Sequence, residues 1–333
     1  MSDEEVRLVQ LSIAARKLSA TEIESLEEQL NLEPTNLDLR LQMLSFYGQY
    51  EGNKLKHKNA EQKLAEQILW LIENEPGIEG YLRLEISRFG HKFKPKTFAT
   101  LRQAWLEQAS ANPLNGAILG NAASFIVWND FETASELFER AYNLQPHEGW
   151  LGLFVIYCNS QLWSLPELYS DKIRKQIIDV GLRSLETESG GAPFLTCEYV
   201  SDAALSLGYY DIVRKCAKEL RDWDQTICEQ MANGFLGLVA LRENNHSLAV
   251  QLMLEMKRGY QPQEVIFRLA KELFDLGERE SIIQLIKSFK RKVRTSARNR
   301  WLNQVENDER PDFDDWCVCS ACMAKEAALK QAK

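Results

Sequence analysis

The sequence predicts an all-α fold built from repeated helical hairpins. Apolar residues recur at i, i+3, i+4 and i+7 spacing along nearly the whole chain, which is typical of amphipathic helices, while alternating strand patterns are scarce. Turn residues that join two helices stand at Gly208, Asn244 and Gly277, which are 36 and 33 residues apart. A period of about 34 residues with two helices in each period predicts an α-solenoid.

Local signals place the elements along this chain. Thr21 and Glu24 have the spacing of a capping box, which predicts a helix start at this point. The apolar pattern then predicts five hairpins, separated mostly by proline or glycine: 36–76, 115–146, 199–220, 233–262 and 269–289. We therefore expect an N-terminal helix or arm over 1–18, the solenoid over 19–308, and a short acidic, cysteine-containing tail over 309–333.

The hairpin expected at 115–146 has the most regular pattern of small and large residues. Its first helix carries Ile118, Ala122 and Phe125, and its second carries Ala134, Phe138 and Ala141. Alanine lets two helices approach closely, and phenylalanine fills the space between hairpins. This hairpin resembles the tetratricopeptide repeat, with Asn121 in place of the usual leucine, and 233–262 resembles it less closely. The resemblance implies a right-handed superhelix that binds proteins and has no chemistry of its own.

Composition and charge narrow the class of partner. The chain has 333 residues, 45% of them hydrophobic, and a formal charge of −8. An acidic protein is poorly suited to bind nucleic acid or an anionic membrane, since both are polyanions. The first residues are acidic, unlike a secretory leader, and no apolar run is long enough to cross a bilayer. We therefore expect a cytoplasmic protein without a membrane partner.

Motifs for catalysis are absent from the sequence. It contains no GxxxxGK[ST] phosphate loop, no HExxH and no GxSxG, and its four histidines are isolated from one another. An enzyme is therefore expected only if the fold assembles a site across the groove from distant residues. The favoured function is a non-catalytic scaffold or assembly factor that holds a protein or peptide on its concave groove.

The groove of such a solenoid is lined by the first helix of each hairpin. The repeat register places eight residues there, and their character changes along the chain from apolar to acidic to basic. These partner-binding candidates are Leu119, Ala123, Ile126, Glu198, Tyr199, Asp202, Arg268 and Lys271.

Three cysteines near the end of the chain suggest a second function. Cys317, Cys319 and Cys322 form a CxCxxC cluster, whereas Cys158, Cys197, Cys216 and Cys228 lie singly among apolar residues and are expected to be buried and reduced. The spacing leaves three interpretations open: reduced thiols in a tail, a metal site, or a redox or modification site. Copper(I) accepts two or three thiolates, whereas zinc prefers four ligands. The alternative function is thus metal handling with Zn or Cu(I), and an ion shared between two chains would make a dimer.

Overall fold

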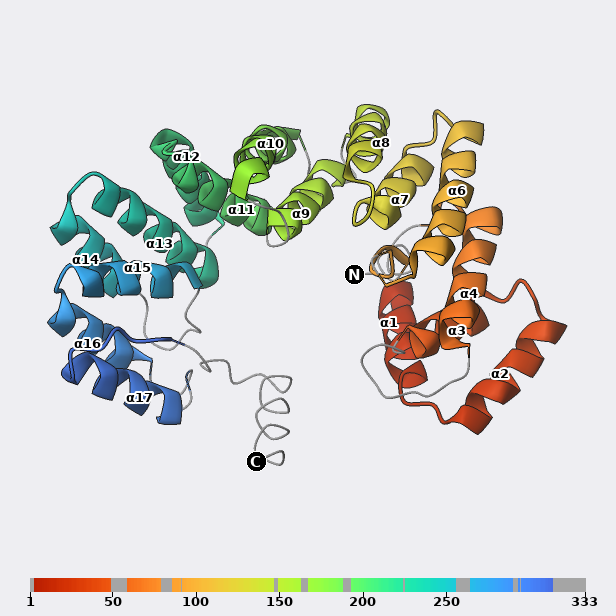
Figure 1. The fold of residues 1–333 in the computed structure, drawn as a ribbon, viewed down its shortest axis with the longest axis horizontal. Coiled ribbons are helices and arrows are strands. Elements are labelled where there is room, and N and C mark those ends of the chain that lie inside the picture. Colours follow the sequence, from red (N-terminus) through yellow and green to blue (C-terminus); the bar gives the residue numbers. More distant parts are fainter. Residues whose placement is uncertain are drawn as a thin grey trace. The chain divides into compact units, whose positions relative to one another are not determined.

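The computed structural model describes residues 3–48, 59–78, 86–90, 92–146, 149–162, 167–187, 193–223, 225–255, 264–289, 293 and 295–313. All regular secondary structure in these ranges is α-helical, which confirms the predicted all-α class. The chain divides into two compact units (Figure 1). Unit 1 comprises Met1–Gln161 and Glu186–Gly191, and unit 2 comprises Leu162–Leu185 and Ala192–Lys333.

Each unit is a succession of helices. The helices that begin in unit 1 are α1 (Asp3–Ala15), α2 (Ala20–Leu32), α3 (Leu37–Tyr47), α4 (Ala60–Asn74), α6 (Pro95–Ala111), α7 (Gly116–Ile126), α8 (Phe131–Leu144) and α9 (Trp150–Leu162). Those that begin in unit 2 are α10 (Glu167–Thr187), α11 (Pro193–Ser206), α12 (Tyr210–Asp222), α13 (Thr226–Arg242), α14 (His246–Leu254), α15 (Glu264–Asp275), α16 (Arg279–Ser288) and α17 (Thr295–Glu306).

The start of α2 corrects one sequence prediction. The capping box is formed by Ser19 and Glu22, two residues before the predicted pair of Thr21 and Glu24. The Glu22 N–H donates to Ser19 Oγ at 3.3 Å, and the Ser19 N–H donates to a Glu22 carboxylate oxygen at 2.7 Å. Both pairs have the same spacing, so the spacing alone could not distinguish them. Ser19 is the residue with extended backbone, which an N-cap requires.

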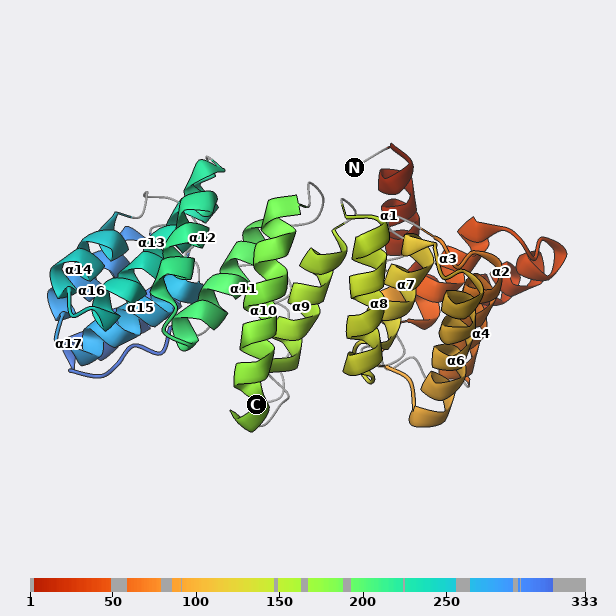
Figure 2. The same cartoon turned by 90° about the horizontal axis from the view of Figure 1, so that it is seen from above.

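The helices α7 and α8 form the hairpin that the sequence predicts most clearly, and Figure 2 shows them side by side. The six predicted core residues of this hairpin are all buried. Asn121, which stands where the tetratricopeptide pattern has leucine, is also buried. Its amide donates to the carbonyl oxygens of Pro76 and Ile78 at 2.9 and 2.8 Å. The Asn121 side chain therefore joins α7 to the segment that follows α4.

The turns of unit 2 confirm the predicted hairpin positions. Gly208, Asn244 and Gly277 have φ of 76°, 60° and 90°, the left-handed conformation that reverses the chain after a helix. They join α11 to α12, α13 to α14 and α15 to α16. The first helices of these hairpins also contact one another, since α13 packs against both α11 and α15. The second helices α14 and α16 are in contact as well.

The chain continues to pack on unit 2 beyond the expected end of the solenoid at 308. Phe313 is buried, and its ring stacks on Phe267 of α15 at a centroid distance of 4.7 Å. Asp312 accepts a hydrogen bond from the indole Nε1 of Trp301 at 2.9 Å. Residues 309–313, expected to begin the tail, therefore complete the core around α17.

Gly120 allows α7 to approach α9. A Cβ atom at this position would lie 2.3 Å from the ring of Trp150, which is almost completely buried. We predict that Gly120→Ala lowers the free energy of unfolding by about 1–3 kcal/mol, because a buried indole has no room to move away. Urea unfolding measures the change. Gly77→Ala is the matched control, since its Cβ would lie 3.8 Å from Ile118, an ordinary contact. Equal effects of the two substitutions would contradict the proposed packing.

Candidate functional site

The apolar part of the predicted groove lies in the core of unit 1. Leu119, Ala123 and Ile126 have no exposed surface. Every residue of α7 is buried, because neighbouring side chains such as Trp150 cover the helix on all sides. An exposed binding surface therefore does not include these three side chains. Their apolar character reflects packing between helices.

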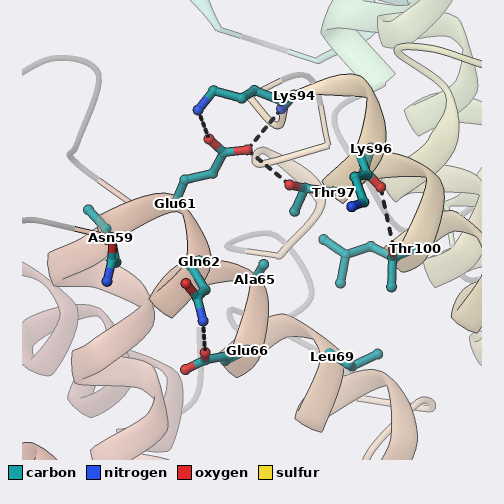
Figure 3. A pocket seen from close by; sticks show the side chains of 12 residues that line it. Asn59, Glu61, Gln62, Ala65, Glu66, Leu69, Lys94, Lys96, Thr97 and Thr100 are labelled. Carbon is teal, nitrogen blue, oxygen red and sulfur yellow. Dashed lines mark hydrogen bonds and ion pairs between the residues drawn. The ribbon is translucent and has the colours of Figure 1, made fainter.

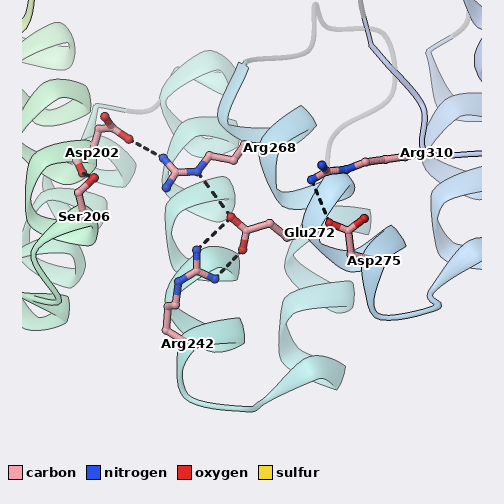
Figure 4. Close-up of polar contacts among 7 residues, drawn as sticks. All are labelled: Asp202, Ser206, Arg242, Arg268, Glu272, Asp275 and Arg310. Carbon is pink, nitrogen blue, oxygen red and sulfur yellow. Dashed lines mark hydrogen bonds and ion pairs between the residues drawn. The ribbon is translucent and has the colours of Figure 1, made fainter. Parts of the chain in front are cut away.

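The acidic and basic parts of the predicted groove meet in unit 2. Arg268 of α15 donates from Nη1 to Asp202 Oδ1 of α11 at 2.6 Å (Figure 4). These residues are 66 positions apart in the chain. Because α13 packs against both α11 and α15, the ion pair spans the helix between them. The Asp202 and Arg268 side chains are 45% and 40% exposed, so a partner has access to both.

The ion pair continues onto α13. Arg268 Nε lies 3.6 Å from Glu272 Oε1, and Glu272 accepts two hydrogen bonds from Arg242 of α13 at 2.5 and 3.0 Å. Asp202, Arg268, Glu272 and Arg242, called here the ion-pair row, thus link the first helices of three hairpins (Figure 4). Because two nitrogens of the Arg242 guanidinium bind the Glu272 carboxylate, each group fixes the orientation of the other. The row is therefore an ordered polar surface.

Glu198 lies one helical turn before Asp202 on α11 and has a different environment. Among the residues that the structure describes, no cation pairs with this half-buried carboxylate. Burial, together with the negative charges of Glu264 and Asp202, raises the pKa of Glu198 to about 7. Burial and the charge of Glu198 also raise the pKa of Tyr199. The Glu198 carboxylate would gain from a cation placed beside it.

Sequence reasoning found some of these residues and missed others. It named Asp202 and Arg268 among its eight candidates but did not predict that the two side chains pair. Lys271, another candidate, is partly exposed on the same helix as Arg268. It missed Arg242 and Glu272. Arg268 and Glu272 have i, i+4 spacing, which is a signal of a pair on a helix surface. No comparable local signal points to Arg242, because its partner is 30 residues away.

Unit 1 has a hollow between the N-terminal halves of α4 and α6 (Figure 3). Glu61 of α4 accepts hydrogen bonds from the Lys94 N–H and the Thr97 hydroxyl, both at 3.1 Å, and pairs with Lys94 Nζ at 3.1 Å. Burial alone would raise the pKa of Glu61, but these hydrogen bonds outweigh it and the pKa is lowered. Glu61 therefore joins α4 to the start of α6. Its bonding explains the local structure without a ligand.

The metal prediction concerns residues that lie outside the described ranges, namely Cys317, Cys319 and Cys322. Within those ranges, no three His, Cys, Asp or Glu side chains are grouped so that they could hold an ion. Cys158, Cys197, Cys216 and Cys228 are buried free thiols, as predicted. The CxCxxC cluster, with Zn or Cu(I) as its ion, stays a prediction.

Comparisons with known proteins add no family to this description. No family model, no curated protein and no solved structure matches the chain. Among the helices that the structure describes, none combines the length and apolar character needed to cross a bilayer. The candidate site therefore rests on the geometry of unit 2.

The environment of Glu198 gives a pH-dependent stability. Because its pKa is raised to about 7 in the folded protein, the folded state favours the protonated form. The contribution of Glu198 to the free energy of unfolding is fully present below its ordinary pKa of 4.5 and is lost as the pH rises through about 7. We predict that Glu198→Gln raises the melting temperature at about pH 8 and has almost no effect near pH 4.5.

Thermal melts at several pH values measure this effect. Glu136→Gln on α8 is the control, because it removes an exposed carboxylate of unit 1. A melting-temperature shift for Glu198→Gln that is the same at both ends of the pH range would show that its carboxylate is not destabilised by its surroundings.

Proposed function

We propose that this chain is a non-catalytic scaffold that holds a protein or peptide on the first helices of unit 2. The proposal includes a right-handed α-solenoid of tetratricopeptide-like hairpins. Three features support this architecture: the recurring turns, the small-residue pattern of α7 and α8, and the contacts of α13 with the first helices on either side of it. An assembly of this kind binds by surface complementarity and requires no cofactor.

The observation that carries the proposal is the ion-pair row. It gathers charged side chains from three successive hairpins onto one face, and its members are 24–45% exposed. An isolated exposed ion pair contributes about 0.2–1 kcal/mol to stability, and a bidentate network such as this row can contribute more. Charges on a binding face also affect partner choice and the rate of association. The row therefore offers a partner an ordered charged surface in addition to what it contributes to folding.

Charge complementarity indicates the kind of partner. Near the middle of α11, the carboxylates of Glu198, Asp202 and Glu264 lie close enough to interact electrostatically. Only Asp202 has a cation, Arg268, among the described residues. This end of the face thus has a surplus of negative charge. We propose a partner segment that carries lysine or arginine, whose cation would be placed beside Glu198.

Selection of short displayed peptides on the purified full chain tests this function. We predict that the selected peptides are enriched in lysine or arginine. Glu198→Lys should weaken their binding by about tenfold or more, which is about 1.4 kcal/mol, since a cation then faces a cation. The loss should be smaller at high salt, because the residues are partly exposed.

The matched control is Glu136→Lys, which makes the same charge change on α8 of unit 1. If the control weakens binding as much as Glu198→Lys, only the net charge of the protein matters and the proposed face is wrong. Selected peptides without basic residues would contradict the proposed partner chemistry.

A further inference from the structure

Two buried thiols meet inside the α11–α12 hairpin of unit 2. Cys197 lies on α11 and Cys216 lies on α12, and both side chains are buried. The Cys197 S–H donates a hydrogen bond to the Cys216 sulfur. The two helices pack against each other on either side of the Gly208 turn. The fold therefore brings together two thiols that stand singly in the sequence.

The hydrogen bond gives the two thiols different acidities. It stabilises the Cys216 thiolate, and hydrogen bonding outweighs burial there, so the pKa of Cys216 is lowered. The same hydrogen bond, together with burial, raises the pKa of Cys197, which therefore keeps its proton. A thiolate is the nucleophilic form of cysteine, and a neighbouring thiol can resolve its oxidised product. Cys216 thus has the chemistry of an attacking thiol, and Cys197 has that of a resolving thiol.

The other two buried cysteines do not share this contact. In the part of the chain that the structure describes, Cys158 of α9 has no thiol partner, and burial raises its pKa. Cys228 of α13 lies near enough to Cys197 to affect its pKa electrostatically, but the two thiols are not hydrogen-bonded among the described residues. No three potential ligands in the described ranges are grouped to hold an ion. The thiol contact is therefore a pair, and its chemistry is that of two sulfur atoms.

We infer that Cys197 and Cys216 are a redox-sensitive thiol pair, which hydrogen peroxide oxidises to a disulfide across the α11–α12 hairpin. The Cys216 thiolate attacks one peroxide oxygen, the O–O bond breaks, and the leaving hydroxide takes a proton to form water. Cys216 is then a sulfenic acid. The Cys197 sulfur attacks the Cys216 sulfur, and the sulfenic hydroxyl leaves with the Cys197 proton as a second water. The two sulfurs together lose two electrons, which reduce the peroxide to water.

Burial of the pair determines how the oxidant reaches it. Peroxide is a small uncharged molecule, and local opening of a hairpin admits such a molecule without global unfolding. The same opening lets the sulfur atoms approach from hydrogen-bond contact to the disulfide bond length of about 2.05 Å. The disulfide then joins α11 to α12 and restrains the helix that carries Glu198 and Asp202. Exchange with a small thiol reverses the reaction.

Peptide mapping of the full chain tests the pair. The three cysteines of the CxCxxC cluster are changed to serine so that their thiols cannot exchange with the pair. The protein is treated with hydrogen peroxide, alkylated under denaturing conditions and digested with trypsin. Since trypsin cleaves after Arg214 and Lys215, Cys197 and Cys216 end in different peptides. We expect mass spectrometry to find these two peptides joined by a disulfide that dithiothreitol separates.

Cys158 is the matched control within the same chain, because it is buried and has no thiol partner among the described residues. It should stay unmodified while the pair is oxidised. Modification of Cys158 at the same rate would show that peroxide acts on an unfolded chain, and the inference would fail. Cys197 and Cys216 that stay unlinked, or a disulfide from Cys197 to Cys228, would also overturn it.

Serine substitutions test the order of the two steps. In Cys197→Ser the sulfenic acid of Cys216 has no resolving thiol, so dimedone should trap it. In Cys216→Ser the protonated Cys197 should react with dimedone after peroxide treatment at least several-fold less, because it is not a thiolate. Equal trapping in the two variants would contradict the assignment of Cys216 as the attacking thiol. If a serine variant does not fold, the peptide map of the parent chain decides by itself.

Discussion

Close approach of neighbouring first helices is the constraint on which unit 2 depends. A Cβ on Gly234 would lie 2.6 Å from Val265, and one on Gly237 would lie 2.4 Å from Leu269. Two glycines on one face of α13 thus let α15 pack against its backbone. The same close approach brings Arg268 and Glu272 of α15 near α11 and α13, because a guanidinium reaches only a few ångströms beyond its own helix. Apolar packing at glycine therefore determines where the charges of the binding face lie.

This coupling explains why charged and apolar residues share the binding face. The first helices are almost fully buried in their middle parts, as in α7 and in α13 from Gln230 to Phe235. Polar groups reach the surface mainly from the outer helices α11 and α15 and from the end of α13, where Arg242 stands. A partner would therefore meet mainly charged groups on this face. Such a face favours a partner that supplies charges of its own.

Sequence patterns were sufficient for the features that depend on a few adjacent residues. Gly208, Asn244 and Gly277 were recognisable as turns, because reversing the chain after a helix requires a residue that tolerates positive φ. Ala134 and Phe138 were recognisable as core residues from their helical spacing. The capping box was misplaced because Ser19 and Thr21 satisfy the same spacing rule, and only the backbone conformation distinguishes them.

The candidate site was less predictable, because it depends on contacts between distant residues. The repeat register placed Leu119 on an open surface, but side chains packed around α7 cover it completely. It also treated Asp202 and Arg268 as separate acidic and basic patches, although they form one ion pair. Glu198 and Asp202, one turn apart on α11, look equivalent in the sequence, yet only Asp202 has a cation among the described residues. That difference gives the two carboxylates different parts in the proposed function. The charge of Asp202 is already balanced by Arg268, and the unpaired Glu198 supplies the attraction that draws a basic partner to the face.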